Sequence, residues 1–416
     1  MSDRTLLLTD QRGVALPMAM LALLILSALV IGFSVLASTE PTIANNQLMV
    51  AQARALAEAG VERAIWALNN PTHADGIPTS LTGTASAPYD GSQLAPVSTG
   101  GIAIGGFRVT VTKAPSSNLE RIITAVGWVP NDTTTNPKAH QRITVKVVFP
   151  PALPAPPAAL SVRGALQMGG NSLIDARADT SCGKKIGTLS TGNTDIQGSA
   201  SDIWGAADEN NTRNEITDAN NGSLPADAHD VVKNLATSSF DQFALSDADI
   251  NALRTYAKAQ GTYLQGTVTF NADNKIPNGL VFIDTTDGQN IAQEGVSPQT
   301  PPSRFANVQI QGNPTADPSG VFSGWLFVNG SLSIDGNFVM HGLAYAQNDI
   351  SYHGVGTGGV WGAMMSRNIR DFVSTSIDSD LFGNALINYN CAYARNGGGM
   401  FQTWAIEPGT YKEVSD

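Results

Sequence analysis

Residues 14–37 form an uninterrupted apolar segment, VALPMAMLALLILSALVIGFSVLA, in which two serines are the only polar side chains. At ~1.5 Å of helical rise per residue, these 24 residues reach about 36 Å, enough to cross a hydrocarbon core of ~30 Å. Arg4 and Arg12 precede the segment, and no basic residue follows before Arg54. This asymmetry predicts a single membrane-spanning helix with its N-terminus in the cytoplasm.

The helical pattern continues beyond the apolar segment. After a break predicted at Glu40-Pro41, the sequence IANNQLMVAQARALAEAGVERAIWALNN has an apolar stripe at helical spacing. A cleaved secretory signal is the competing interpretation, because small residues precede Ser38. Such signals usually have an apolar core of only ~7–15 residues, whereas this one is longer and leads into a second helix. We therefore expect a helical spine over residues 14–70.

Two motifs in this spine carry a family resemblance. QRGVALPMAMLALLILSAL followed by ARALAEAGVERA resembles the N-terminal region of PilX-type minor pilins of type IV pili. The resemblance implies that residues 1–13 are a leader, which a prepilin peptidase removes between Gly13 and Val14, and that Val14 is then N-methylated. It further implies storage in the inner membrane before assembly, with other minor pilins and the major pilin as partners at the cell surface.

Met18 departs from the usual pilin pattern. Most pilins carry Glu at the fifth mature position, where it pairs with the N-terminus of a neighbouring subunit, and counting from Val14 that position is Met18. A buried ammonium without a carboxylate partner is costly. The resemblance therefore points to a rare subunit at or near the filament tip. A type II secretion pseudopilin that caps a periplasmic filament shares this lack and is the alternative.

Residues 71–149 are predicted to form a small antiparallel headpiece. Three runs, 105–114, 120–129 and 140–149, are rich in Val, Ile and Thr, and the first and third of them alternate with polar residues as half-buried strands do. Such a sheet packed on the second half of the helix is the headpiece that the resemblance implies. The proline-rich run PPALPAPPAA at 150–159 then predicts a stiff linker and a domain boundary.

Residues 160–416 are predicted to form a β-solenoid-like body. GWLFVNGSLSIDGN and GLAYAQNDISYHGV align at a period of 18 residues, and a shorter copy starts at Gly362. Short strands at a fixed period, separated by Gly and Asn, are typical of solenoids. An irregular β-sandwich is the rival interpretation. The repeat is lost over about 200–320, which we interpret as an insertion that contains a helix at 247–261.

Charge and cysteine content restrict the partners of this body. Residues 158–416 carry 14 Lys and Arg against 26 Asp and Glu, a net charge of −12, so nucleic acid is an improbable ligand. The chain has two cysteines, Cys182 and Cys391. Export to an oxidising compartment would favour a disulfide between them, and two free buried thiols are the alternative.

The sequence contains no recognisable catalytic or metal-binding motif. The five histidines have no metal-ligand spacing, although His341 and His353 lie in neighbouring repeats and could approach one another. The acidic loops at 271–274 and 284–288 could supply oxygen ligands to calcium, but neither completes a calcium-binding loop, and turn geometry explains them equally well. We expect neither an enzyme nor a bound metal or cofactor.

Together these features predict a mostly β, α+β chain with a transmembrane and amphipathic helix, an antiparallel headpiece and a β-solenoid-like body. The expected function is that of a minor pilin in type IV pilus assembly. Besides the secretion pseudopilin, a surface adhesin or DNA-binding pilus module remains an alternative, and the sequence identifies no ligand for the body.

Overall fold

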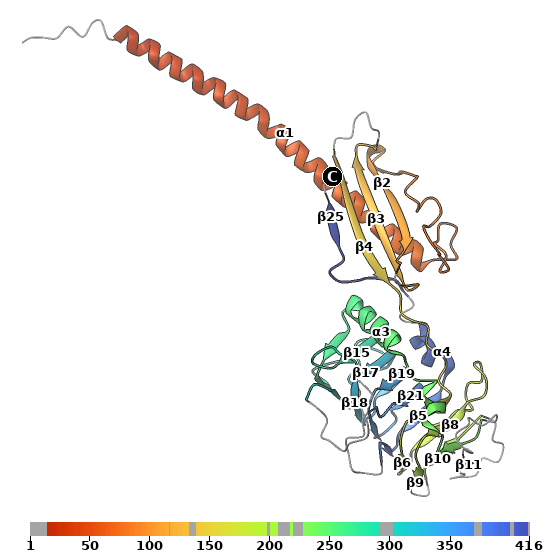
Figure 1. Cartoon of the computed structure of the whole chain (residues 1–416). Helices are drawn as coiled ribbons and strands as arrows, with labels where there is room; N and C mark the ends of the chain where they lie inside the picture. Colours follow the sequence, from red (N-terminus) through yellow and green to blue (C-terminus); the bar gives the residue numbers. More distant parts are fainter. Residues whose placement is uncertain are drawn as a thin grey trace, which may run out of the picture.

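The computed structural model describes residues 15–115, 117–132, 139–197, 200–206, 217–218, 228–291, 303–369, 377–399 and 403–414. The chain has a long N-terminal helix, an antiparallel sheet beside the second half of that helix, and a mostly β body beyond the sheet (Figure 1). This agrees with the predicted α+β, mostly β architecture.

Helix α1 (Ala15–Asn69) is continuous through Pro41, so the predicted break at Glu40-Pro41 is wrong. Proline removes one backbone donor, but the turns on either side keep their own hydrogen bonds. Nearby hydroxyls also bond back to the helix: the Oγ of Ser38 donates to Val35 O (2.8 Å), and the Oγ1 of Thr39 donates to Leu36 O (2.9 Å). The 55 residues of this helix give it a length of about 80 Å.

The headpiece sheet has four neighbouring antiparallel strands, β1 (Ala95–Thr99), β2 (Ile102–Lys113), β3 (Glu120–Val129) and β4 (Ala139–Val148). Strands β2, β3 and β4 lie where the sequence predicts strands. In β3, every second side chain is buried. The alternation turns one face of the sheet towards α1, as expected for a half-buried strand.

Small residues allow α1 to approach this sheet closely. Ala53, Ala57 and Ala64 are fully buried at the contact. A Cβ atom on Gly60 would lie 3.1 Å from side-chain atoms of Ala125, Phe107 and Val109. A Cβ atom on Gly127, in β3, would collide with the carbonyl oxygen of Ala53. Glycine on both surfaces therefore sets the distance between helix and sheet.

The C-terminal residues complete the headpiece and do not belong to the body. Strands β24 (Ala405–Ile406) and β25 (Lys412–Val414) both pair antiparallel with β4 (Figure 1). We predicted that all residues from 160 onwards belong to the body, but residues 405–414 belong to the headpiece sheet. The reason is the free edge of β4, whose unpaired backbone groups the two short strands satisfy.

The body contains two open, parallel sheets that share one apolar core. The neighbouring strands of the first are β11 (Thr217–Asp218), β12 (Val231–Lys233), β8 (Ile186–Ser190), β5 (Ala158–Val162), β21 (Gly359–Ser366), β19 (Val339–Ala346), β17 (Phe322–Val328), β15 (Gly279–Asp284) and β13 (Tyr263–Gln265). Those of the second are β14 (Thr267–Phe270), β16 (Ala306–Gln311), β18 (Gly330–Gly336), β20 (Ile350–Gly354), β22 (Ser379–Gly383), β6 (Leu166–Met168) and β9 (Thr194–Ile196). Strands β7 (Leu173–Asp175), β10 (Asp202–Trp204) and β23 (Leu386–Tyr389) branch from the first sheet. A body with this many parallel strands buries its apolar side chains between the sheets.

The 18-residue repeat of the sequence corresponds to strand pairing. Gly324 and Gly342 are register partners in β17 and β19, and Leu332 and Ile350 are partners in β18 and β20. The two-residue slip of the third copy is also present, because Gly342 pairs with Gly362. Each repeat thus supplies one strand to each sheet.

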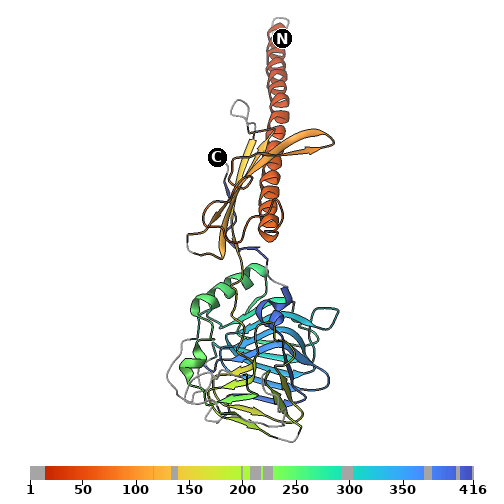
Figure 2. The same ribbon diagram turned by 90° about the vertical axis from the view of Figure 1, so that its right-hand side faces the viewer.

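The order of strands in space differs from their order in sequence. The body starts in the middle of the first sheet, where β5 pairs with β21, and proceeds outward to β8 and β12. Helices α2 (Thr237–Asp241) and α3 (Asp247–Gln260) then precede the opposite end at β13, from which the strands return to β21. Figure 2 shows α2 and α3 beside the stacked strands.

The predicted insertion at 200–320 is therefore partly wrong, because β13 to β16 lie within it and belong to the two sheets. A long connection between β15 and β16 interrupts the period and hides the repeat from the sequence: Gly279 pairs with Gly324, 45 positions later. The helix predicted at 247–261 is present as α3. It begins with a capping box between Ser246 and Asp249.

We predict that Gly60→Leu destabilises the headpiece by roughly 1–2 kcal/mol. Overpacking a tight contact costs about 1–3 kcal/mol, and the better helix propensity of Leu offsets up to about 1 kcal/mol. The matched control is Ala59→Leu, because Ala59 is exposed on the same helix. Thermal unfolding of the detergent-solubilised protein, followed by circular dichroism, measures both. Equal melting temperatures for the two variants would contradict the packing described here.

Candidate functional site

The first half of α1 is an apolar surface that nothing in the described chain covers. Every residue from Ala15 to Leu48 is exposed, and an 18-residue window of this helix has a mean hydropathy of 2.7 with none of it buried. By length and composition, α1 could cross a membrane, and it is the only such helix among the described residues. Burial of α1 begins at the headpiece, where Ala53 is the first fully buried residue.

Met18 lies on this uncovered surface, and the residue is 68% exposed. No acidic or basic side chain occurs between Arg12 and Glu40, so nothing in this part of α1 can pair with a charge. Gly13 and Val14, the residues at the expected cleavage site, lie outside the described residues. Cleavage and methylation at these two positions remain a proposal.

The tail that follows the body is anchored in the headpiece by Trp404, which is 6% exposed. Its backbone N–H donates to Asn69 Oδ1 at the end of α1 (2.6 Å). Its ring packs against Phe149, with 5.2 Å between the ring centroids, and the Arg121 guanidinium lies 4.8 Å from the indole ring. Aromatic and cation–π contacts of this kind add stabilisation beyond the buried area.

Ion pairs hold the same tail to the sheet. Lys146 in β4 pairs with Glu120 (2.9 Å) and with Glu407 (3.0 Å), and Arg54 of α1 pairs with Glu413 (3.6 Å). The body is thus joined to the headpiece at both of its chain ends, at residue 149 and at residue 404. Sequence reasoning missed this second connection, because the paired strands are only two and three residues long.

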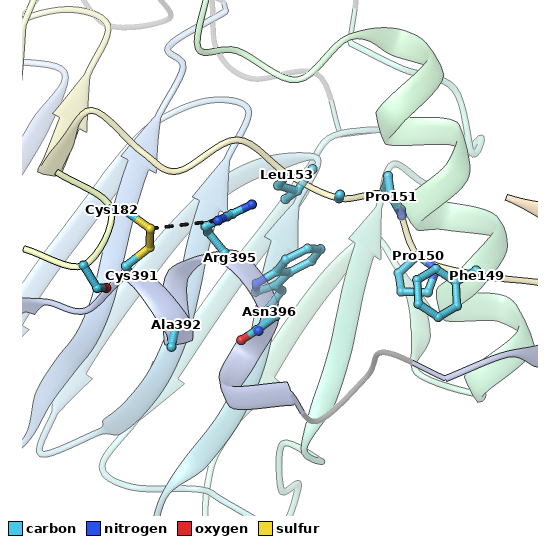
Figure 3. Close-up of a pocket in the computed structure, with 12 residues that line it drawn as sticks. Phe149, Pro150, Pro151, Leu153, Cys182, Cys391, Ala392, Arg395 and Asn396 are labelled. Carbon is cyan, nitrogen blue, oxygen red and sulfur yellow. Dashed lines mark hydrogen bonds between the residues drawn. A yellow bond between two sulfur atoms is a disulfide. The ribbon is translucent and has the colours of Figure 1, made fainter. Parts of the chain in front are cut away.

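Cys182 and Cys391 form a disulfide with Cα atoms 5.9 Å apart (Figure 3). Cys182 follows β7 and Cys391 begins helix α4 (Cys391–Asn396), and β7 pairs with β23 just before α4. The Asp179 carboxylate further joins the two segments, since it accepts from the backbone N–H of Ser181 and of Cys391, both at 2.8 Å. The bridge therefore lies where the first and last parts of the body meet, in the middle of the stack of strands.

His341 and His353 lie in different sheets, on β19 and β20, and each has its own partners. The His341 ring stacks on Tyr393 with centroids 4.5 Å apart, and burial lowers the pKa of His341. His353 lies on the outer face of the second sheet. Its Nδ1 is 3.4 Å from Asp335 Oδ1, and its Nε2 is 2.6 Å from Asp380 Oδ2. These contacts join three neighbouring strands at the surface.

The two acidic loops have structural partners. The Asn271 side chain accepts from the backbone N–H groups of Asp273 and Asn274, both at 2.9 Å, as in an Asx turn. Asp284 is fully buried and pairs with Arg254 of α3, with 2.6 Å between Nε and Oδ2. Among the residues that the structure describes, no group of three or more His, Cys, Asp or Glu side chains is arranged to hold a metal ion.

No family model matches this chain, and no curated protein matches it. Among solved structures, the competence-associated pilin ComZ from Thermus thermophilus aligns with 88% of this chain and 98% of its own, at 12% sequence identity and a TM-score of 0.27. A TM-score this low establishes neither a shared fold nor a shared function.

We predict that the native protein contains the Cys182–Cys391 bridge in solution. Closing a loop of 209 residues contributes roughly 5 kcal/mol of stability in the chain-entropy model, less any strain. Peptide mapping under non-reducing conditions should recover the two cysteines in one linked pair. Complete alkylation of both thiols in unreduced, denatured protein would contradict the bridge.

Proposed function

We propose that this chain is a minor pilin of a type IV pilus, stored in the inner membrane and then incorporated at or near the filament tip. The observation that carries the proposal is the division of one continuous helix into an uncovered apolar half and a half packed on an antiparallel sheet. The resemblance of residues 11–68 to PilX-type minor pilins supports the same assignment.

The uncovered half of α1 requires a partner environment. Large apolar side chains are exposed along its whole length from Leu16 to Leu36. Burying one such side chain is favourable by about 1.5–3 kcal/mol, so leaving all of them in water would cost tens of kcal/mol. A bilayer can cover this surface before assembly. The apolar segments of neighbouring subunits can cover it afterwards, as interhelical packing does in other helical assemblies.

The absence of a charge at Met18 supports a particular position of this subunit in the filament. If Val14 is the mature N-terminus, its ammonium and that of a neighbouring subunit enter an apolar core in which Met18 offers no negative charge. Even a partly relaxed unpaired charge costs several kcal/mol, which corresponds to roughly a thousandfold reduction in incorporation. The penalty is smaller at the tip, where one side of the subunit has no neighbour.

The body supports display at a filament end. We infer that its paired strands form the successive coils of a solenoid-like domain, which is too large to be repeated at every position of a tightly packed filament. Its attachment at residues 149 and 404 would hold it at a fixed orientation beyond the headpiece, because two connections restrain rotation where a single linker does not. Such an arrangement suits a rigid presenting module.

A pseudopilin that caps a type II secretion filament is the second candidate, and the absence of a carboxylate at Met18 favours it as well. Deletion of the gene separates the two. Loss of surface pili and of twitching, with export of enzymes intact, supports the pilus. Blocked export of secreted enzymes with normal piliation supports the secretion system.

We predict that processing leaves Val14 as the mature terminus. N-terminal mass spectrometry of membrane-extracted protein should find a methylated Val14, with residues 14–37 retained. Gly13→Leu should prevent cleavage because a bulky side chain obstructs the close approach of the peptidase to the backbone, whereas Gly32→Ala, with open space around it, should be processed normally. A mature terminus at Ser38 would refute the pilin assignment.

A further inference from the structure

The tail that follows the body lies between the apolar cores of the headpiece and the body. In β24, Ala405 packs against the core of the body, whereas its neighbours Trp404 and Ile406 pack against the core of the headpiece. Neighbouring side chains of a strand point to opposite faces, so this short strand contacts both cores at once. The end of β4 is arranged in the same way, with Val147 in the headpiece core and Val148 in the core of the body.

The body also holds the tail through a hydrogen bond. Tyr256 of α3 is fully buried, and its hydroxyl donates to the carbonyl oxygen of Thr403 (3.0 Å). The same hydroxyl accepts from Gln260 Nε2 (3.0 Å), and burial raises the pKa of Tyr256, which keeps the hydroxyl protonated as a donor. Helix α3 is fixed to the first sheet by the ion pair between Arg254 and the buried Asp284. The position of the tail therefore depends on elements of the folded body.

The strands of the tail are too short to hold β4 by themselves. They have two and three residues, and the bond from the Lys146 backbone N–H to Thr410 Oγ1 (3.1 Å) joins positions that are 264 residues apart. Closing a loop of that length costs conformational entropy, which a few strand pairs do not offset. Folding of the body closes most of this loop beforehand, because it brings the linker and α4 together around one cavity, which Pro150 and Arg395 both line (Figure 3).

We propose that the tail is a strap that closes on β4 only when the body is folded, so that the headpiece sheet is completed only in subunits with a folded body. A subunit with an unfolded body would present the open edge of β4, whose Ile143, Val145 and Val147 belong to the headpiece core. An open strand edge of this kind is a template for pairing with other chains. The tail would thus couple the state of the body to the surface of the headpiece. This coupling goes beyond the proposed pilin role and does not depend on it.

Coupling between two parts of a protein is reciprocal. If the folded body favours closure of the tail, then the closed tail must stabilise the body by the same factor. Trp404 provides a test, because it is buried in the core of the headpiece and does not belong to the core of the body. A substitution at Trp404 should therefore affect the body through the tail.

The first experiment is hydrogen–deuterium exchange of the full-length protein in detergent micelles along a urea series, read by mass spectrometry with residue-level fragmentation. The Lys146 amide reports closure of the tail, and the amides of β19 report folding of the body. We expect Lys146 to lose protection at the same urea concentration as β19 or at a lower one. Phe338→Ala, which removes a fully buried ring from the core of the body, should lower both concentrations. The matched control is Val355→Ala, because Val355 is 61% exposed, and it should lower neither.

Trp404→Ala is the second variant, and it leaves the core of the body unchanged. We expect it to make exchange of the most protected β19 amides at least about fivefold faster, the lower end of typical coupling between two sites. Trp66→Ala is its control, since Trp66 is a 44% exposed tryptophan of α1, and it should leave β19 unchanged. The proposal is overturned if Lys146 stays protected at a urea concentration at which β19 has exchanged, or if Trp404→Ala leaves exchange of β19 unchanged.

Discussion

The packing of the second half of α1 against the headpiece sheet is the contact on which the rest of the structure depends. Small residues at this contact bring the helix within direct reach of β3, with Gly60 on one surface and Gly127 on the other. Because the sheet holds the second half of α1, the apolar first half of this continuous helix projects away from the headpiece (Figure 1). This apolar half therefore needs an apolar environment outside the described chain, whereas the other half of the same helix is covered by the headpiece sheet.

The same sheet also determines how the body is held. Strand β4 has α1 across its face and would have a free edge without the tail, and β24 and β25 fill that edge. Trp404 fixes the point at which the tail enters. Since the body begins and ends in the middle of its own stack, both connections leave from one region, near the disulfide between Cys182 and Cys391. The headpiece, the linker and the start of the body are thereby tied together.

Much of this architecture could be predicted from local patterns. The apolar segment, the alternating strands β2 to β4 and the register of Gly324 with Gly342 all depend on neighbours in sequence or on a fixed period. Three features could not be predicted in this way. Helix α1 passes through Pro41 because the hydrogen bonds of the remaining turns outweigh one missing donor. Strands β13 to β16 could not be recognised because a long connection breaks the period. Strand β25 pairs with β4, which lies about 270 residues away in the sequence.

The residues of the candidate sites can be divided in the same way, into those that a local sequence pattern predicts and those that only the fold brings together. Gly13, Val14 and Met18 follow from a motif, whereas the cavity beside Arg395 arises only when the linker and α4 are brought together by the fold. Nothing in the sequence around Arg395 distinguishes it from other exposed arginines, and only the fold places it beside the disulfide. Contacts between residues far apart in the sequence cannot be predicted from local sequence patterns.

We propose that the chain is a sparsely incorporated filament subunit that displays its body at the tip. Immunogold labelling of sheared surface filaments with antibodies against the body, residues 160–404, tests it most directly. We expect gold at filament ends and little along the shafts. Met18→Glu should raise lateral labelling only modestly, because the size of the body still limits incorporation. Uniform decoration along the shafts, or filaments that never carry label, would contradict it.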